Sequence, residues 1–196
     1  MKKLAIIFIL AGIGLLGVGG YQFVKTYAAE KNSLLEAKQL LEKSDYSAGD
    51  KEVLDVPEFR PGFGETVGIL EIPKIDAELP IVEGTDPDDL DKGVGHYTGT
   101  AYPRENDQIV LSGHRNTVFR KLGDVEIGDT FVVRLPHGEF IYEMVASKIV
   151  EADDRTVIQS TAPEEILTIT TCYPFGYLGN APQRYIITAK PVEAAS

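Results

Sequence analysis

The longest apolar stretch of the chain lies at its N-terminus. An uninterrupted run of apolar and glycine residues covers positions 4–20 and extends to Val24 past one polar residue, Gln22. A helix needs about 20 such residues to cross a bilayer, so the pattern predicts a transmembrane anchor over residues 1–24. Two lysines before the run favour a cytoplasmic N-terminus, and we therefore expect a single-pass membrane protein with its folded part outside the cell membrane.

A cleaved signal peptide is the alternative interpretation of the same stretch. Its cleavage site would lie near Thr26, Tyr27 and Ala28. The apolar run is long for the hydrophobic region of a signal peptide, which favours the anchor. Under both interpretations the rest of the chain works outside the cytoplasmic membrane.

The next segment, residues 25–65, is predicted to be a helical stalk followed by a linker. Residues 28–45 have helical periodicity, and Ser33 and Glu36 match the capping-box pattern S-x-x-E at a helix start. This helix would either stand as a stalk or pack loosely on the folded domain. Residues 45–65 are rich in glycine and proline, which is typical of irregular chain.

From residue 66 onward the hydrophobic pattern is that of short strands. Runs of β-branched and aromatic residues, separated by turn residues, predict strands at 68–72, 79–82, 107–111, 130–135, 139–149, 166–171 and 185–189. Helical signals are short, at 86–90, 117–122 and 162–166. Many short strands at this spacing indicate a mainly β domain, a closed or nearly closed barrel, over residues 66–196.

Charge and cysteine content narrow the classes of function. The formal net charge is -11, so phosphate backbones repel the chain and nucleic acid is not expected as a partner. The chain has one cysteine, which excludes an intramolecular disulfide and a zinc site made of several cysteines.

The single cysteine, Cys172, lies at the end of a predicted strand and is followed by Tyr173 and Pro174. Considered alone, a lone cysteine is most simply a small buried hydrophobic residue. A free thiol outside the cell is a liability unless it is used, and a strand end before a proline turn would hold a nucleophile rigidly. Cys172 is therefore a candidate catalytic nucleophile.

His114 and Arg184 are the candidates that could assist such a thiol. His114 follows a predicted strand and Gly113, where it could act as a general acid or base or be a structural loop residue. Arg184 begins the last strand, where it could be a surface charge or a fixed donor to the oxygen that becomes negative in acyl transfer.

The remaining histidines have simpler interpretations. His96, in Gly95-His96-Tyr97, either lines the same pocket or satisfies a turn. His137, in a predicted hairpin turn, is expected to be solvated.

An acidic segment offers oxygen ligands that calcium could use. Its candidates are Asp86, Asp88, Asp89 and Asp91. The alternative is the start of a short helix with a solvated acidic face. We expect no required cofactor, with calcium stimulation as the alternative that this segment leaves open.

Four segments resemble motifs of the sortase family, and the histidine, cysteine and arginine motifs follow one another in the family's order. The segment ending at Cys172 resembles the family's Thr-Leu-x-Thr-Cys signature with Ile169 in place of leucine, and Leu-Ser-Gly-His-Arg at 111–115 resembles its histidine motif. Gln-Arg-Tyr at 183–185 matches its arginine position, and 93–100 resembles the segment before the histidine. The sequence after the cysteine is most similar to class D sortases.

The resemblance implies an eight-stranded β-barrel with short helices, preceded by the transmembrane helix. It implies that Cys172 attacks a Leu-Pro-x-Thr-type sorting signal after threonine, that His114 protonates the leaving amine and that Arg184 binds the substrate or the oxyanion. A peptidoglycan amine would then resolve the thioester, which attaches a surface protein to the cell wall. His96 and Thr171 are further candidates for substrate contact.

Two alternatives stay open at this point. A secreted cysteine endopeptidase would use the same thiol and histidine but hydrolyse its substrate without an amine acceptor. A catalytically inactive, membrane-tethered binding module would use neither group.

Overall fold

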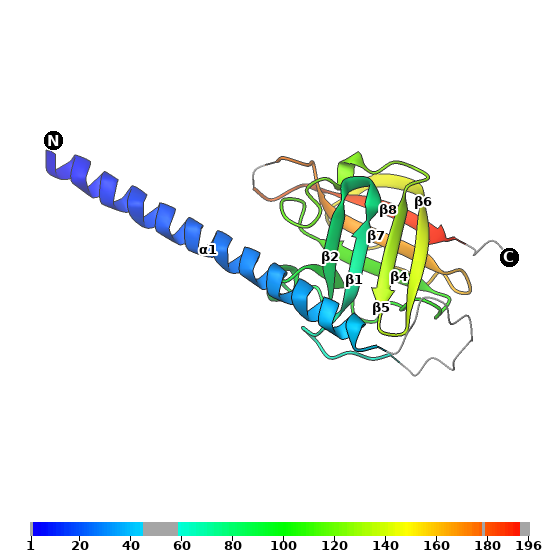
Figure 1. Cartoon of the computed structure of the whole chain (residues 1–196). Coiled ribbons are helices and arrows are strands. Elements are labelled where there is room, and N and C mark those ends of the chain that lie inside the picture. Colours follow the sequence, from blue (N-terminus) through cyan, green and yellow to red (C-terminus); the bar gives the residue numbers. More distant parts are fainter. Residues whose placement is uncertain (1, 45–58, 178, 193–196) are drawn as a thin grey trace.

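The computed structural model describes residues 2–44, 59–177 and 179–192, and it consists of a long N-terminal helix and a β-barrel (Figure 1). Part of the predicted linker, residues 45–58, lies outside the described residues. The helices are α1 (Lys2–Glu42) and α2 (Pro87–Leu90), with 3-10 turns at Pro73–Ile75 and Leu122–Asp124. The strands are β1 (Thr66–Ile72), β2 (Ala77–Glu83), β3 (Val94–His96), β4 (Gln108–Gly113), β5 (Thr130–Leu135), β6 (Gly138–Glu151), β7 (Ile166–Tyr173) and β8 (Gln183–Pro191).

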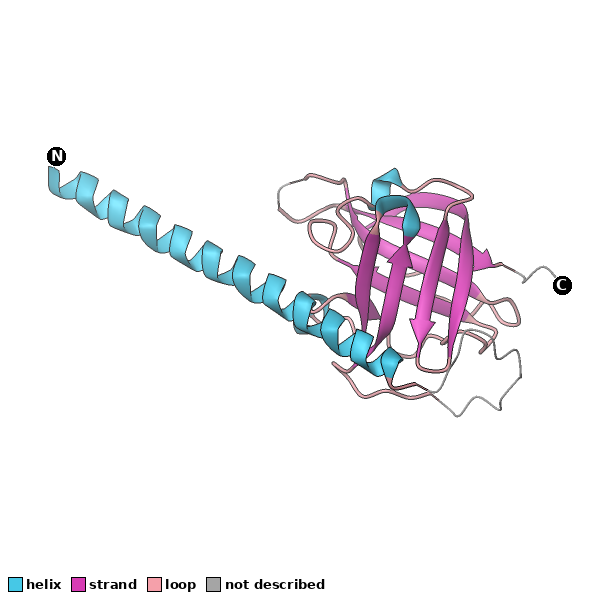
Figure 2. Ribbon diagram, viewed as in Figure 1, coloured by secondary structure: helices cyan, strands magenta, loops and turns pink. Residues whose placement is uncertain are grey.

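The strands close into a barrel in the order β1-β2-β3-β4-β7-β8-β6-β5, which confirms the closed eight-stranded fold. The pairs β2–β3 and β4–β7 are parallel, and the other pairs are antiparallel. Figure 2 shows the strands forming the body of the domain, with short helical segments near its ends and the C-terminal part of the long helix α1 lying against it. Closure gives every strand two neighbours and leaves no open sheet edge.

The barrel interior is filled by alternating apolar side chains. On β5, Phe131, Val133 and Leu135 are buried while the residues between them are partly exposed, which is the period of two expected of a strand with one face inside. Tyr142 and Met144 of β6 continue the same core. Each such large side chain contributes about 1.5–3 kcal/mol on burial, so the core rather than any polar pair holds the barrel closed.

The β5–β6 hairpin turn at Pro136 and His137 forms as predicted, but the expectation that His137 is solvated is wrong. Its ring is half-buried, with centroids 4.9 Å from Phe59 and 5.7 Å from Phe140. Burial lowers the pKa of His137, and its buried Nε2 has no hydrogen-bond partner among the described residues.

The N-terminal helix differs from its prediction, because α1 runs without a break from the apolar segment into the stalk. Ser33 is therefore not an N-cap but lies inside the helix, where the preceding helical turn supplies the acceptor for its backbone N–H. Within the described residues, 5–42 have a mean hydropathy of up to 1.9 over a membrane-length window and are long enough to cross a bilayer.

The second half of α1 packs on the barrel rather than standing free (Figure 1). Ser33 and Ala37 are buried, Lys38 forms an ion pair with Glu78 of β2 at 2.6 Å, and Thr66 of β1 donates a hydrogen bond to Glu36 at 2.7 Å. The large apolar side chains of the first half, from Ile6 to Val24, are exposed. The helix thus has one segment suited to the barrel and one suited to lipid.

A buried carboxylate ties β2 to β3 and to the loop after it. Oε2 of Glu83 lies 2.6 Å from Nδ1 of His96 and accepts a hydrogen bond from the Tyr102 hydroxyl at 2.6 Å, while Oε1 accepts one from Thr98 at 2.7 Å. Burial alone would raise the pKa of Glu83, but these hydrogen bonds outweigh it and hold the pKa below its usual value. A buried carboxylate is stable here because all its partners are present.

This network predicts a stability that depends on pH. Because the folded pKa of Glu83 is lowered, its contribution is complete above the unfolded pKa of about 4.3 and is lost as pH falls through the folded value. Glu83→Gln should lower the free energy of unfolding at pH 7 by about 1.5–3 kcal/mol. Below about pH 4, the free energy of unfolding of this variant should decrease less with falling pH than that of the wild type. Urea unfolding of the detergent-solubilised chain, followed by tyrosine fluorescence, measures both.

The matched control lies on the same strand. Glu78→Gln removes an ion pair whose side chains are 44% and 38% exposed, so it should change the unfolding free energy by less than about 1 kcal/mol. Equal losses in the two variants, or an unchanged acid limb in Glu83→Gln, would contradict the role of the buried network.

Candidate active site

The strand register brings two of the candidate residues together at one rim of the barrel. In the parallel pair β4–β7, Gly113 lies opposite Thr171. His114 and Cys172 are the next residues along these two strands, and the carboxyl ends of parallel strands meet at the same edge. Neighbouring strands are about 4.8 Å apart, so the imidazole and the thiol project from adjacent positions.

The third candidate comes from the other neighbour of β7. Arg184 of β8 lies directly opposite Cys172 in the antiparallel register, and opposite residues place their side chains on the same face of the sheet. A thiol, an imidazole and a guanidinium therefore gather from three consecutive strands of the barrel. Together they offer a nucleophile, a proton donor and a fixed positive charge.

Two contacts fix the backbone beneath this group. The hydroxyl of Thr171, which is 3% exposed, donates a hydrogen bond to the carbonyl oxygen of Gly113 at 2.7 Å and so locks the ends of β7 and β4 together. A Cβ added at Gly113 would lie 2.6 Å from ring carbons of Phe119, so only glycine lets this ring pack against the strand end. Both contacts hold the residues adjacent to the thiol and the imidazole.

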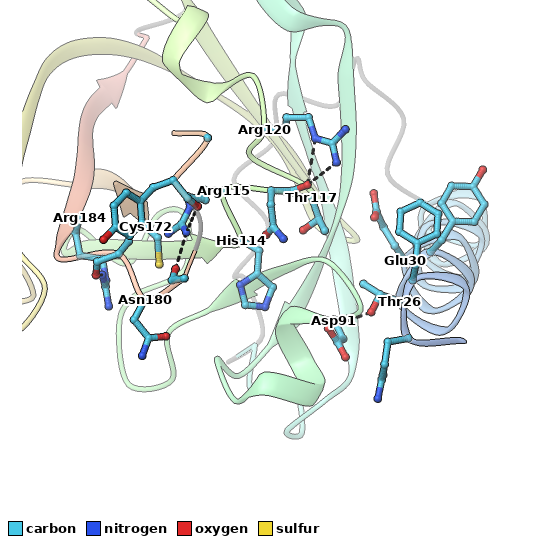
Figure 3. A pocket seen from close by; sticks show the side chains of 18 residues that line it. Thr26, Glu30, Asp91, His114, Arg115, Thr117, Arg120, Cys172, Asn180 and Arg184 are labelled. Atoms are coloured by element: carbon cyan, nitrogen blue, oxygen red, sulfur yellow. Dashed lines mark hydrogen bonds between the residues drawn. The ribbon is translucent and has the colours of Figure 1, made fainter. Parts of the chain in front are cut away.

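The three side chains open into a groove of about 1140 Å³. Figure 3 shows Cys172 and Arg184 on one side of the groove, His114 near its centre, and Thr26 and Glu30 of α1 on the opposite side. The β7–β8 loop lies along the side that carries the thiol. Burial raises the pKa of Glu30, which stands at the lip of the groove.

The contribution of α1 to the groove was not predicted from the sequence. Phe23, Thr26, Tyr27 and Glu30 line it, and their spacing of i, i+3, i+4 and i+7 places them on one face of a helix. That periodicity was available in the sequence, although nothing there indicated what the face would meet. Thr26 also donates a hydrogen bond to Asp91 of the barrel at 3.3 Å.

The guanidinium of Arg184 is held by its own strand end. Its Nη1 donates to the carbonyl oxygens of Gln183 at 2.9 Å and Ala181 at 3.3 Å. Both hydrogen bonds use Nη1, so within the described part of the chain Nε and Nη2 are left for a ligand. An arginine anchored in this way is a preorganised donor toward the groove.

His96 and Thr171, the further candidates for substrate contact, do not line the groove. His96 is 1% exposed, lies 2.6 Å from Glu83, and stacks on Tyr102 with ring centroids 4.1 Å apart. These contacts correspond to the structural role that the sequence left open for it. Thr171 contributes through its hydrogen bond to Gly113 rather than through its surface.

The four acidic candidates for calcium do not converge either. Asp86 and Asp89 cap α2 reciprocally, and Asp91 accepts the hydrogen bond from Thr26. Within residues 2–44, 59–177 and 179–192, no three histidine, cysteine or acidic side chains gather as a metal ion would require. The short helix α2, with its proline at the first turn, forms as predicted.

Comparison with known proteins gives consistent results. A family model described as "Sortase domain" matches residues 70–192. The chain is 51% identical over 197 residues to Sortase D of Bacillus subtilis (strain 168), covering 98% of this chain and 100% of that protein. Among solved structures, it is similar to a Sortase D5 transpeptidase of Clostridium perfringens, with a TM-score of 0.69, 30% identity and coverage of 84% and 99%.

A second solved structure contains a peptide motif. It is sortase C of Clostridium perfringens with the C-terminal cell wall sorting motif, which matches with a TM-score of 0.62 and 25% identity over 85% of this chain and 89% of that one.

Proposed function

The chain belongs to the sortase family, and on that premise we propose that it cleaves a Leu-Pro-x-Thr-type sorting signal after threonine and transfers the protein to a peptidoglycan amine. As a sortase it is a cysteine transpeptidase that acts on sorting-signal substrates. The observation that supports the proposal is the register of β4, β7 and β8, because it places His114, Cys172 and Arg184 on one rim.

The first half of the proposed reaction forms a thioester. The thiolate of Cys172 attacks the carbonyl carbon after threonine, and the negative charge that develops on the oxygen is stabilised by the guanidinium of Arg184. The C–N bond then breaks, and His114, as imidazolium, gives its proton to the departing amine. The enzyme is left with a thioester at Cys172 and a neutral imidazole.

The second half reverses these roles. An amine of the peptidoglycan precursor attacks the thioester carbon, and neutral His114 accepts the proton that the amine releases. The C–S bond breaks, the thiolate is restored and the new amide leaves the groove. The steps balance without a cofactor, because the proton that His114 gives to the departing amine is recovered from the incoming amine.

Transfer rather than hydrolysis is tested by supplying acceptors. The full chain in detergent is given a Leu-Pro-x-Thr peptide with triglycine or diaminopimelate, and products are analysed by mass spectrometry. Products that carry the amine support the transpeptidase. Hydrolysed peptide alone, at every amine concentration, would identify a cysteine endopeptidase, and failure of a thiol probe to label Cys172 would favour a binding module.

The family and the helix also suggest where the enzyme works. Sortases are associated with the cell surface, and α1 provides one apolar helix long enough to anchor the chain. We propose a single-pass protein of the cell membrane with its N-terminus in the cytoplasm and the barrel outside. Its proposed partners are surface proteins with a C-terminal sorting signal, the peptidoglycan amine and the membrane itself.

A further prediction concerns calcium. Because Asp86 and Asp89 are engaged in capping and Asp91 in a hydrogen bond to α1, we expect no calcium requirement. Turnover should stay within about twofold when a chelator is added and when calcium is titrated back, a margin well below the several kcal/mol that a catalytic metal supplies. A strong stimulation by calcium, abolished in Asp86→Asn, would overturn this prediction.

A further inference from the structure

The β7–β8 loop, residues 174–182, connects the strand that carries Cys172 to the strand that carries Arg184, and both of its ends are fixed. At its start, Phe175 packs against Tyr185 with ring centroids 5.5 Å apart. At its end, the carbonyl oxygen of Pro182 accepts a hydrogen bond from the backbone of Ala152 at 2.9 Å. The base of the loop therefore moves with the barrel.

The residues that the structure describes in the middle of the loop, 176, 177, 179 and 180, are exposed. Gly176 and Gly179 have φ angles of 75° and 96°, both glycines are exposed, and a Cβ at either would meet no atom within 4 Å. Glycine is favoured at both positions because it adopts a positive φ angle without strain, whereas other residues do not. The loop tip needs an external contact to keep one position beside the groove.

Arg115 supplies that contact. Its Nη2 donates hydrogen bonds to the carbonyl oxygens of Tyr177 at 2.7 Å and Gly179 at 2.9 Å, and its guanidinium carbon lies 5.9 Å from the centroid of the Tyr177 ring. Among the described residues, these are the hydrogen bonds that join the stretch 176–180 to a side chain outside the loop. Figure 3 shows Arg115 beside Cys172 and Arg184, on the loop side of the groove.

We propose that Arg115 is a positioning residue, which holds the β7–β8 loop against the groove and thereby sets how well the sorting peptide binds. The inference rests on the proposed function, because it assigns the groove to that peptide. Arg115 directly follows His114, whereas the loop begins two residues after Cys172. One side chain thus joins the chain segments that bear the proposed acid and the proposed nucleophile, and closes one wall of the groove between them.

The chemistry of the contact favours arginine over lysine. A guanidinium is planar, stays charged and can serve two carbonyl oxygens while its face lies near an aromatic ring. A lysine ammonium is a point charge that would reach one of the two carbonyls with less directional preference. Arg115→Lys should therefore keep part of the effect, and Arg115→Ala should lose it.

The test measures peptide affinity and loop order separately in the full chain in detergent. In Arg115→Ala, KM for a Leu-Pro-x-Thr peptide should rise about tenfold while kcat changes less, the effect of losing one or two net hydrogen bonds from the wall of a binding site. Without substrate, backbone amides at 176–180 should exchange hydrogen faster, while β4 and β7 stay protected. Arg115→Lys should be intermediate in both.

Arg120 provides the matched control for charge. It also lines the groove, but its guanidinium donates to the carbonyl oxygen of Asn116 at 2.7 Å and, in the described part of the chain, forms no hydrogen bond to the loop. Arg120→Ala removes the same charge, so loop exchange should stay at the wild-type rate. Wild-type KM and loop exchange in Arg115→Ala, or equally fast loop exchange in Arg120→Ala, would overturn the proposal.

The loop proposal and the proposed function fail in different ways. If the wild-type chain cleaves none of the Leu-Pro-x-Thr peptides, the substrate assignment fails. The exchange data, which need no substrate, still decide whether Arg115 orders the loop. If β4 and β7 lose protection in Arg115→Ala, that variant has a damaged barrel and Arg115→Lys becomes the test. Wild-type loop exchange and wild-type KM in Arg115→Lys would then contradict the proposal.

Discussion

Replacing Cys172 with alanine is expected to abolish turnover and to eliminate the acyl-enzyme. The sulfur is the only atom of the proposed site that forms a bond to the substrate, and neither His114 nor Arg184 can replace it. Loss of a catalytic nucleophile typically lowers kcat by about 10⁶-fold. Intact-protein mass spectrometry after mixing with a Leu-Pro-x-Thr peptide should show the thioester adduct on the wild type and no adduct on Cys172→Ala.

The single cysteine makes the control unusually direct. The chain contains one thiol, so a thiol-directed reagent can modify only Cys172. Wild-type activity should disappear in step with labelling, whereas Cys172→Ala should take up no label. Residual cleavage of the peptide by Cys172→Ala would remove Cys172 from its proposed role.

Replacing Arg184 with alanine is expected to lower kcat by about 100-fold or more, the scale of losing one oxyanion donor. Arg184 lies opposite Cys172 in the β7–β8 register, where the carbonyl oxygen of an attacked peptide would acquire its charge. Its Nη1 is already bound to the carbonyls of Ala181 and Gln183, so the guanidinium is oriented before substrate arrives. Steady-state kinetics with saturating peptide measures the effect on kcat apart from KM.

Two comparisons separate this role from a general effect of charge. Arg184→Lys keeps the charge but loses the planar guanidinium with its several N–H donors. Its kcat should lie between those of Arg184→Ala and the wild type. Lys190→Ala removes a cation at the far end of the same strand, where the side chain is 53% exposed, and kcat should stay within about twofold. An unchanged kcat in Arg184→Ala would make Arg184 structural.

Most of the barrel was predictable because its strands bury one face. The period of two in β5, for example, is visible in the sequence and is the same pattern that fills the core. The strand that was missed, β3, has three residues with a glycine in the middle, too few to display a period. Its identity as a strand depends on pairing with β2 and β4, and this pairing is not visible within a segment of three residues.

The candidate site was predictable in composition but not in geometry. Local sequence places His114 and Cys172 at strand ends, yet their adjacency follows from the pairing of β4 with β7, which no local pattern contains. The family resemblance supplied that adjacency as an expectation. Arg115 and the groove-lining face of α1 were not assigned, because their partners are backbone carbonyls and a surface that exist only in the folded chain.

The unbroken course of α1 has a consequence for how the enzyme meets its substrates. A helix of 41 residues is about 60 Å long, and a bilayer accommodates about 30 Å of it. In the proposed topology, the groove wall formed by Phe23, Thr26, Tyr27 and Glu30 begins where the lipid ends. Because the next part of the same helix is packed on the barrel, this topology would hold the thiol at a fixed height close to the headgroups. For a substrate protein that is itself held at the membrane, encounter would then depend on the height of its cleavage site above the bilayer, because a tethered partner meets the enzyme at an effective rather than a bulk concentration.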